Sequence, residues 1–173
     1  MRKLKYARLI AILAALASGA AISAPPSEPQ SLSQSQSAAV ESAVRAFVQT
    51  VAHDVTHDGP SAWRKHLSDG PAFFMAVNGQ MVFANSEAAT AGIQAFAPTI
   101  KHIELNWADD LRVDPLTSNL AVVAATYHEI QISTNGERID GTGFFTGTAE
   151  YHNGHWQFRN AHWSMPISAP LTK

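Results

Sequence analysis

The spacing of apolar residues changes along this chain from a helical repeat to a strand-like alternation. The helical repeat has intervals of three and four residues, and its members are Val40, Val44, Phe47, Val48, Val51 and Val55. Such a stripe predicts one amphipathic helix, which ends at Gly59-Pro60. Residues 61–67 predict a second, short helix that stops before Asp69-Gly70-Pro71.

Two short apolar runs, residues 72–77 and 81–84, lie on either side of Asn78-Gly79. Asn-Gly favours a tight type I′ turn, because both central residues of that turn need positive φ. The pattern therefore predicts a β-hairpin. A third helix is predicted over residues 86–97, and Pro98 closes it.

The remaining residues alternate like β-structure. Four runs are separated by Asp-Pro and Asn-Gly turn signals, and they cover residues 100–113, 119–133, 138–152 and 155–165. The order of elements predicts one α+β domain over residues 38–168. In this domain the helices gather on one face of a mainly antiparallel sheet.

The N-terminal segment has the pattern of a secretory signal peptide. Four basic residues precede an apolar run at residues 9–17, and small residues follow. This run is too short to span a bilayer. We predict cleavage after Ser23, and then a disordered leader over residues 24–37 that is rich in Pro, Ser and Gln. The mature protein is expected to be periplasmic or secreted, with no membrane attachment.

Charge and composition exclude several kinds of partner and chemistry. Residues 1–23 hold 4 of the 12 basic residues and none of the 14 acidic residues, so the mature chain carries a net charge of −6. We therefore expect no nucleic-acid partner. The sequence has no cysteine, no Gly-x-Ser-x-Gly elbow and no phosphate-binding glycine loop. His53 and His57 have the spacing of metal ligands on a helix, but they lie on its solvent side without a third ligand, so we expect no metal and no cofactor.

The last run, "GHWQFRNAHWS" (154–164), resembles the final strand of SnoaL-like and ketosteroid-isomerase-like proteins of the nuclear-transport-factor-2-like superfamily. Members of this group commonly end in Gly-x-Trp-x-apolar followed by His-x-His-x-Ser. The matching residues are Gly154, Trp156, Phe158, His162 and Ser164, while Asn160 replaces the first histidine. "FFTGTAEYHNG" (144–154) resembles the preceding strand of the family. The order of elements extends the resemblance over the whole domain.

The resemblance implies a cone in which a strongly bent sheet and three helices enclose a pocket. It places Trp163 inside that pocket, and strand alternation then adds Arg159 on the same concave side. The other face receives Trp156, Phe158 and His162, unless a bulge changes the alternation. Large apolar groups on this convex face predict a homodimer formed through it.

The resemblance does not extend to steroid-isomerase chemistry. The catalytic base of those enzymes falls near Met75, their helix tyrosine near Phe47, and their strand acid near Thr146. None of these three residues can perform the corresponding role. The reaction of the isomerases is therefore not expected here.

Arg159 is the residue for which packing offers the weakest explanation. A buried guanidinium needs a partner, and the sequence offers two: an internal carboxylate, with Glu129 first, or an acidic ligand. Gly143 and Gly147 share one face of the intervening strand, which leaves a gap where long side chains meet or a ligand lies.

The predicted pocket residues combine aromatic and polar groups, namely Trp63, His66, Phe73, Tyr127, Glu129, Arg159 and Trp163. The first hypothesis is a domain that binds a small, mostly apolar molecule, either neutral or acidic. A second is an isomerase, lyase or hydrolase with His66, Tyr127 or Glu129 as acid–base group. A third is a dimeric assembly module with a vestigial pocket, in which Tyr127 is only a core residue.

Overall fold

The computed structural model describes residues 31–166, so the predicted signal peptide and most of the predicted leader lie outside the described residues. The first helix, α1 (Gln34–Asp58), begins inside the segment that we assigned to the leader. Its start is set by a capping box: the Ser33 side chain accepts from the Gln36 backbone, and the Gln36 side chain accepts from Ser33 N. This reciprocal pair satisfies amides that the helix itself leaves unbonded.

The other helices follow the predicted order. After α1 come the 3-10 turn η1 (Pro60–Ala62), α2 (Trp63–His66), α3 (Ser86–Phe96) and the 3-10 turn η2 (Ala97–Thr99). The Asn85 side chain caps α3 by accepting from Ala88 N at 2.8 Å. Within residues 31–166, no helix is both long enough and apolar enough to cross a membrane.

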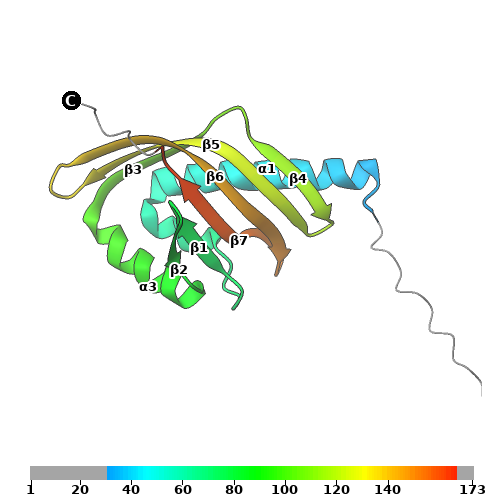
Figure 1. Cartoon of the computed structure of the whole chain (residues 1–173), viewed down its shortest axis with the longest axis horizontal. Coiled ribbons are helices and arrows are strands. Elements are labelled where there is room, and N and C mark those ends of the chain that lie inside the picture. The colour runs from blue at the N-terminus through cyan, green and yellow to red at the C-terminus, as the bar shows by residue number, and fades with distance from the viewer. Residues whose placement is uncertain (1–30, 167–173) are drawn as a thin grey trace, which may run out of the picture. The chain divides into compact units, whose positions relative to one another are not determined.

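In the described part of the chain, seven strands form one bent, open sheet (Figure 1). They are β1 (Phe74–Val77), β2 (Gln80–Phe83), β3 (Ile100–Trp107), β4 (Arg112–Thr117), β5 (Leu120–Ser133), β6 (Arg138–His152) and β7 (His155–Ser164). Their order is β2-β1-β7-β6-β5-β3, with β4 pairing to β5 as well. Every pair is antiparallel except β1 with β7.

The predicted long strand over residues 100–113 is two strands, β3 and β4. They pair with different halves of β5, and the chain turns between them. Asp110 holds this turn, because its carboxylate accepts from Thr126 N at 2.9 Å and from Thr126 Oγ1 at 2.6 Å. Pro115 was expected to separate strands, but it lies within β4. Proline is tolerated there because β4 pairs with β5 alone, as an edge strand does.

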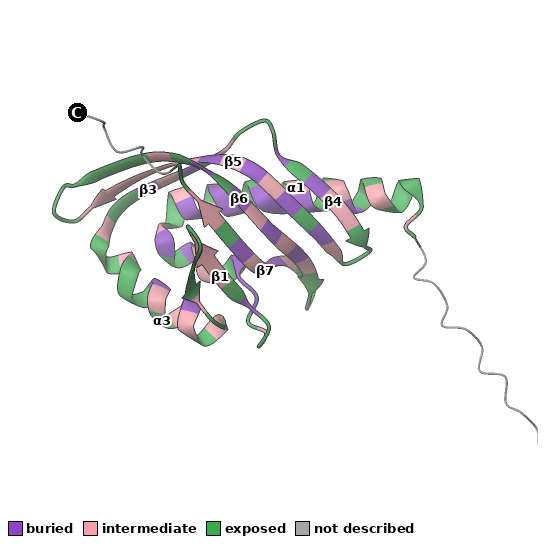
Figure 2. Cartoon of the chain, viewed as in Figure 1, coloured by how far each residue is buried: buried purple, intermediate pink, exposed green. Residues whose placement is uncertain are grey.

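The core lies between α1 and the concave face of the sheet. Val44, Val48 and Val51 of α1 are fully buried, as are Phe145 and Phe158 of the sheet. Buried and more exposed positions alternate along β5 and β6 (Figure 2), as expected for strands with one covered face.

A β-bulge in β7 corrects the predicted alternation. Thr148 of β6 pairs with Asn160, but the next residue, Ala149, pairs with Phe158. Arg159 is therefore an extra residue without a partner on β6. It reverses the alternation, so Phe158 and Asn160 face opposite sides of the sheet. Phe158 consequently faces the core, while Arg159 is exposed.

The bulge moves two of the residues that we placed on the convex face. Phe158 is fully buried, with its ring centroid 4.9 Å from that of Phe47 on α1. Trp156 is half-buried, and its ring contacts Tyr151 at 5.5 Å. Of the three residues named for the predicted dimer contact, His162 alone is exposed.

Candidate functional site

Trp163 is the centre of an aromatic cluster on the concave face. Its ring meets Trp63 of α2 edge-on at 5.5 Å, Tyr127 of β5 edge-on at 4.7 Å, and Phe145 at 4.7 Å. Trp107 of β3 stacks against it at 5.8 Å and donates its indole N–H to the Val48 carbonyl of α1. Sheet and helices together therefore fix Trp163 in place, and rings fill the middle of this face.

The gap predicted over Gly143 and Gly147 is filled by neighbouring aromatic side chains. A Cβ atom on Gly143 would lie 2.5 Å from the Tyr127 hydroxyl and 2.2 Å from the Ser164 carbonyl. A Cβ on Gly147 would lie 2.7 Å from the Phe145 ring. These glycines let aromatic rings lie directly on the strand, so neither position leaves room for a ligand.

The concave face of the sheet is less crowded at the next pair of facing residues along these two strands, Glu129 and Gly141. These two residues are direct partners across β5 and β6, as Tyr127 and Gly143 are. A Cβ atom on Gly141 would meet nothing within 4 Å, which shows open space above this glycine. We call the space bounded by Tyr127, Glu129 and Gly141 the Glu129 site.

Within residues 31–166, Glu129 is a half-buried carboxyl group without a basic partner. Gln131, two residues along the same strand face, donates its side-chain amide to the Glu129 carboxylate. Burial raises the pKa of Glu129, and the Gln131 hydrogen bond opposes this rise. Burial also raises the pKa of Tyr127, and the negative charge of Glu129 raises it further. The two groups therefore influence each other electrostatically within the site.

Arg159 pairs with Glu150 and not with Glu129, the first of the two partners that the sequence offered. Arg159 Nη1 lies 3.1 Å from Glu150 Oε2, and Glu150 also accepts from Ser68 Oγ at 2.9 Å. The reason is the bulge, which takes Arg159 out of the alternation that Trp163 follows. The ion pair is structural, and Arg159 lies outside the Glu129 site.

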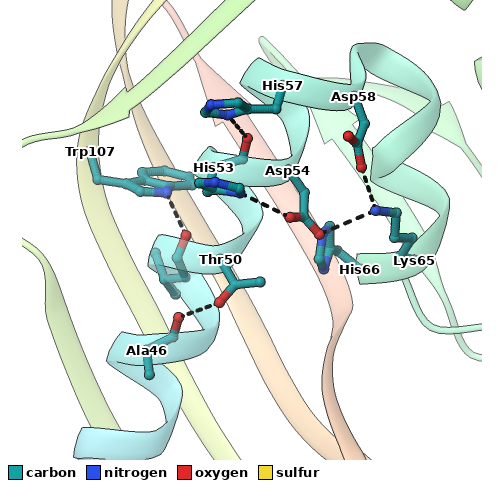
Figure 3. A network of polar contacts seen from close by, with 10 residues as sticks. Ala46, Thr50, His53, Asp54, His57, Asp58, Lys65, His66 and Trp107 are labelled. Atoms are coloured by element: carbon teal, nitrogen blue, oxygen red, sulfur yellow. Dashed lines mark hydrogen bonds and ion pairs between the residues drawn. The ribbon is translucent and has the colours of Figure 1, made fainter.

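His66 and Phe73 also lie outside the Glu129 site. His66 is buried between α2 and α1, where its Nε2 lies 3.1 Å from Asp54 Oδ2 (Figure 3). Burial lowers the pKa of His66, and the Asp54 charge opposes this. Lys65 lies 2.7 Å from Asp58 and 3.3 Å from Asp54 in the same network. Phe73 is a fully buried core residue.

The stacked rings of His53 and His57 are exposed on α1, at a centroid distance of 4.2 Å. Across residues 31–166, no group of three or more His, Cys, Asp or Glu side chains is placed to hold a metal ion.

Trp107 and Gly141 belong to the site region, but the sequence did not predict them there. Neither residue has a sequence pattern that indicates its neighbours across the sheet: one is a lone tryptophan in a strand-like run, and the other is a glycine in "DGTG".

Glu129→Gln is expected to stabilise the protein increasingly as pH rises. The folded-state pKa of Glu129 lies above that of an unfolded chain, so the folded protein binds more protons between the two values. Stability is therefore lost as pH rises through this interval. Glutamine keeps the shape and cannot ionise, so the variant should gain about 1 kcal/mol near pH 8, or roughly 2–4 °C in Tm, and little near pH 4. Thermal unfolding at both pH values checks this, with exposed Glu137→Gln as the matched control.

Comparison with known proteins identifies the fold. No protein-family model and no curated protein matches this chain. The structure is similar to a nuclear transport factor 2-like superfamily protein from Salmonella enterica (TM-score 0.64, 13% identity, 78% of this chain and 96% of that chain). It is also similar to a protein proposed to be a scytalone dehydratase from Novosphingobium aromaticivorans (TM-score 0.61, 13% identity, 73% and 83%). A hexachlorocyclohexane dehydrochlorinase gives a TM-score of 0.58 at 14% identity, with 76% and 88% covered. This chain therefore has the nuclear-transport-factor-2-like, or cystatin-like, fold.

Proposed function

We propose that this chain is an exported SnoaL-like domain that binds a small, mostly apolar molecule in the Glu129 site. One observation carries the proposal: open space above Gly141 adjoins a half-buried carboxyl group that has no basic partner among the described residues. Removing such a carboxyl group from water lowers the free energy of unfolding, and the packing around it does not offset this loss. Groups of this kind concentrate at functional sites.

The surroundings of the site favour an apolar ligand. Tyr127 closes one side of the space, and Trp163 packs against Tyr127. On the other side, Ile139 is 54% exposed, and it pairs with Gln131 on the same face as Gly141. An apolar molecule of a few carbon atoms would cover this exposed side chain. The acidic group that we first assigned to the ligand loses its support, because Arg159 is bound to Glu150.

Gly141→Leu is expected to weaken binding of an uncharged apolar dye, Nile red, by about tenfold or more. The leucine side chain would fill the space above Gly141, where the backbone φ imposes no strain. The matched control is Thr142→Leu, which adds the same side chain at the next, exposed position on the opposite face. Fluorescence titration of all three proteins measures the affinity, and circular dichroism checks that each is folded.

Two outcomes would overturn this proposal. In the first, the folded wild-type protein does not bind Nile red in a saturable, one-to-one manner. In the second, Gly141→Leu and Thr142→Leu bind equally well, which would place the dye elsewhere on the domain. Native mass spectrometry of protein purified from its own host would then search for the natural ligand.

A second candidate function is acid–base catalysis in the same site. The raised pKa of Glu129 favours it, since a carboxyl group of this kind can hold or accept a proton closer to neutral pH. Two of the similar structures are described as a dehydratase and a dehydrochlorinase, which supports an enzyme on this fold. The filled centre of the concave face instead favours the assembly module with a vestigial pocket.

Export and dimer formation through the convex face stay predictions. Phe158 and Trp156 no longer support that interface. Three other apolar side chains support it, because Phe74, Val122 and Phe144 are 42%, 36% and 44% exposed. Phe144 and Val122 are on strands whose alternate residues face the core, so they point outward. Light scattering at micromolar concentration tests the dimer, and N-terminal sequencing of exported protein tests cleavage near Ser23.

A further inference from the structure

The charge on Glu129 has no complement within the described part of the chain. Burial and the Gln131 amide are the influences on its pKa, and no charged side chain of α1, α3, β3 or β6 contributes. On the neighbouring strands its face is shared by Ile103 and Leu105 of β3 and by Gly141 of β6. Tyr127 is the titratable group beside it. Nothing in residues 31–166 therefore neutralises this carboxylate.

We propose, resting on the function proposed above, that the ligand of the Glu129 site carries a basic nitrogen, and that its ammonium group binds the Glu129 carboxylate. The Gln131 amide occupies Oε1 of Glu129, so Oε2 is free to accept from the ligand. The exposed side chain of Ile139, which pairs with Gln131 on the same face, can cover the carbon skeleton of such a ligand. An acidic ligand would meet repulsion from Glu129 in the same space.

Binding of an amine is linked to ionisation of Glu129. The ammonium group requires the carboxylate form, and burial shifts ionisation of this residue to higher pH. Affinity for an amine should therefore rise as pH rises through the ionisation of Glu129, and binding on the acid side of that ionisation should release a proton. Tyr127 does not reverse this trend, because its own raised pKa keeps it neutral while Glu129 ionises.

The test compares three probes that share a phenyl ring and a short chain: phenethylamine, phenethyl alcohol and phenylacetate. Displacement of Nile red or isothermal titration calorimetry measures each affinity. Phenethylamine is expected to bind about 10- to 150-fold more tightly than the alcohol near pH 8, the range for a charge-assisted hydrogen bond. Phenylacetate should bind most weakly.

Glu129→Gln should remove the preference for the amine, so that the ratio of amine affinity to alcohol affinity falls to about one. The matched control is Glu104→Gln, on the adjacent strand and opposite face, where Glu104 pairs with Ile130. This control should keep both the preference and its pH dependence. A folded Glu129→Gln protein that binds the alcohol shows that the site itself is intact.

The outcomes separate this inference from the proposed function. Equal binding of amine and alcohol, or tighter binding of phenylacetate, overturns the basic ligand, while the Gly141→Leu result still supports an apolar site. Unchanged amine preference in Glu129→Gln also overturns it, because another group would then hold the ammonium. Failure of Nile red and all three probes to bind the wild-type protein overturns both proposals.

Discussion

Phe158→Ala is expected to lower the free energy of unfolding by about 3–5 kcal/mol. The ring is fully buried, and its centroid lies 4.9 Å from that of Phe47 and 5.0 Å from that of Phe145. Removing it would leave a cavity between α1 and the sheet, which the rigid strand cannot close. Urea denaturation followed by circular dichroism measures the loss.

His162→Ala is the matched control on the same strand. Without the bulge at Arg159, simple alternation would put Phe158 and His162 on one face. With the bulge, His162 is exposed and its replacement should change stability by no more than about 0.5 kcal/mol. Similar small losses of stability in both variants would show that Phe158 faces outward and that β7 has no bulge at Arg159.

Gly143→Ala is the second substitution with a large expected effect, a loss of about 1–3 kcal/mol or more. Its Cβ would lie 2.2 Å from the backbone carbonyl of Ser164 and 2.6 Å from Cζ of Tyr127. The carbonyl belongs to β7 and cannot move away without disturbing the pairing of β6 with β7. The Tyr127 ring is itself held against Trp163.

Gly141→Ala provides the comparison two residues away on the same strand and face. Its Cβ meets nothing within 4 Å, so the variant should be as stable as wild type or gain about 0.4–1 kcal/mol from a stiffer unfolded chain. Thermal unfolding of both variants measures the difference. Equal losses in the two proteins would mean that the space above Gly141 is closed, which would also undermine the Glu129 site.

Local signals predicted most of the fold because they act over a few residues. The Asn78-Gly79 and Asn153-Gly154 turns are confirmed, with positive φ at all four residues. The α1 stripe and the start of α3 are likewise confirmed. The division between β3 and β4 was missed, because the Asp110 contact that holds the turn depends on Thr126 on another strand.

The candidate site was predictable only in part, for the same reason. Trp63, Tyr127 and Trp163 lie together in the aromatic cluster of the concave face, and their role in binding stays a prediction. Arg159 was misplaced because a single inserted residue reverses alternation, and no residue in "QFRNA" marks the bulge. The open space at Gly141 depends on which glycine a neighbouring aromatic ring covers. The sequence does not distinguish Gly141, which lies beside open space, from Gly143, which the Tyr127 ring covers.

The position of β7 in the sheet determines when this domain can complete its folding. It is the last strand in chain order, yet it lies between β1 and β6, and Phe74–Val77 of β1 pair with residues 160–163. The β1–β2 hairpin therefore gains its place only after almost the whole domain has been made. Such distant pairings are slow, because the chain loses the entropy of a long loop before any contact forms. Strands β3 and β4 cover much of α1 earlier, but the Phe47 ring of α1 gains its neighbour Phe158 only when β7 arrives. A growing chain would therefore keep this part of the core exposed to aggregation until the final strand is made.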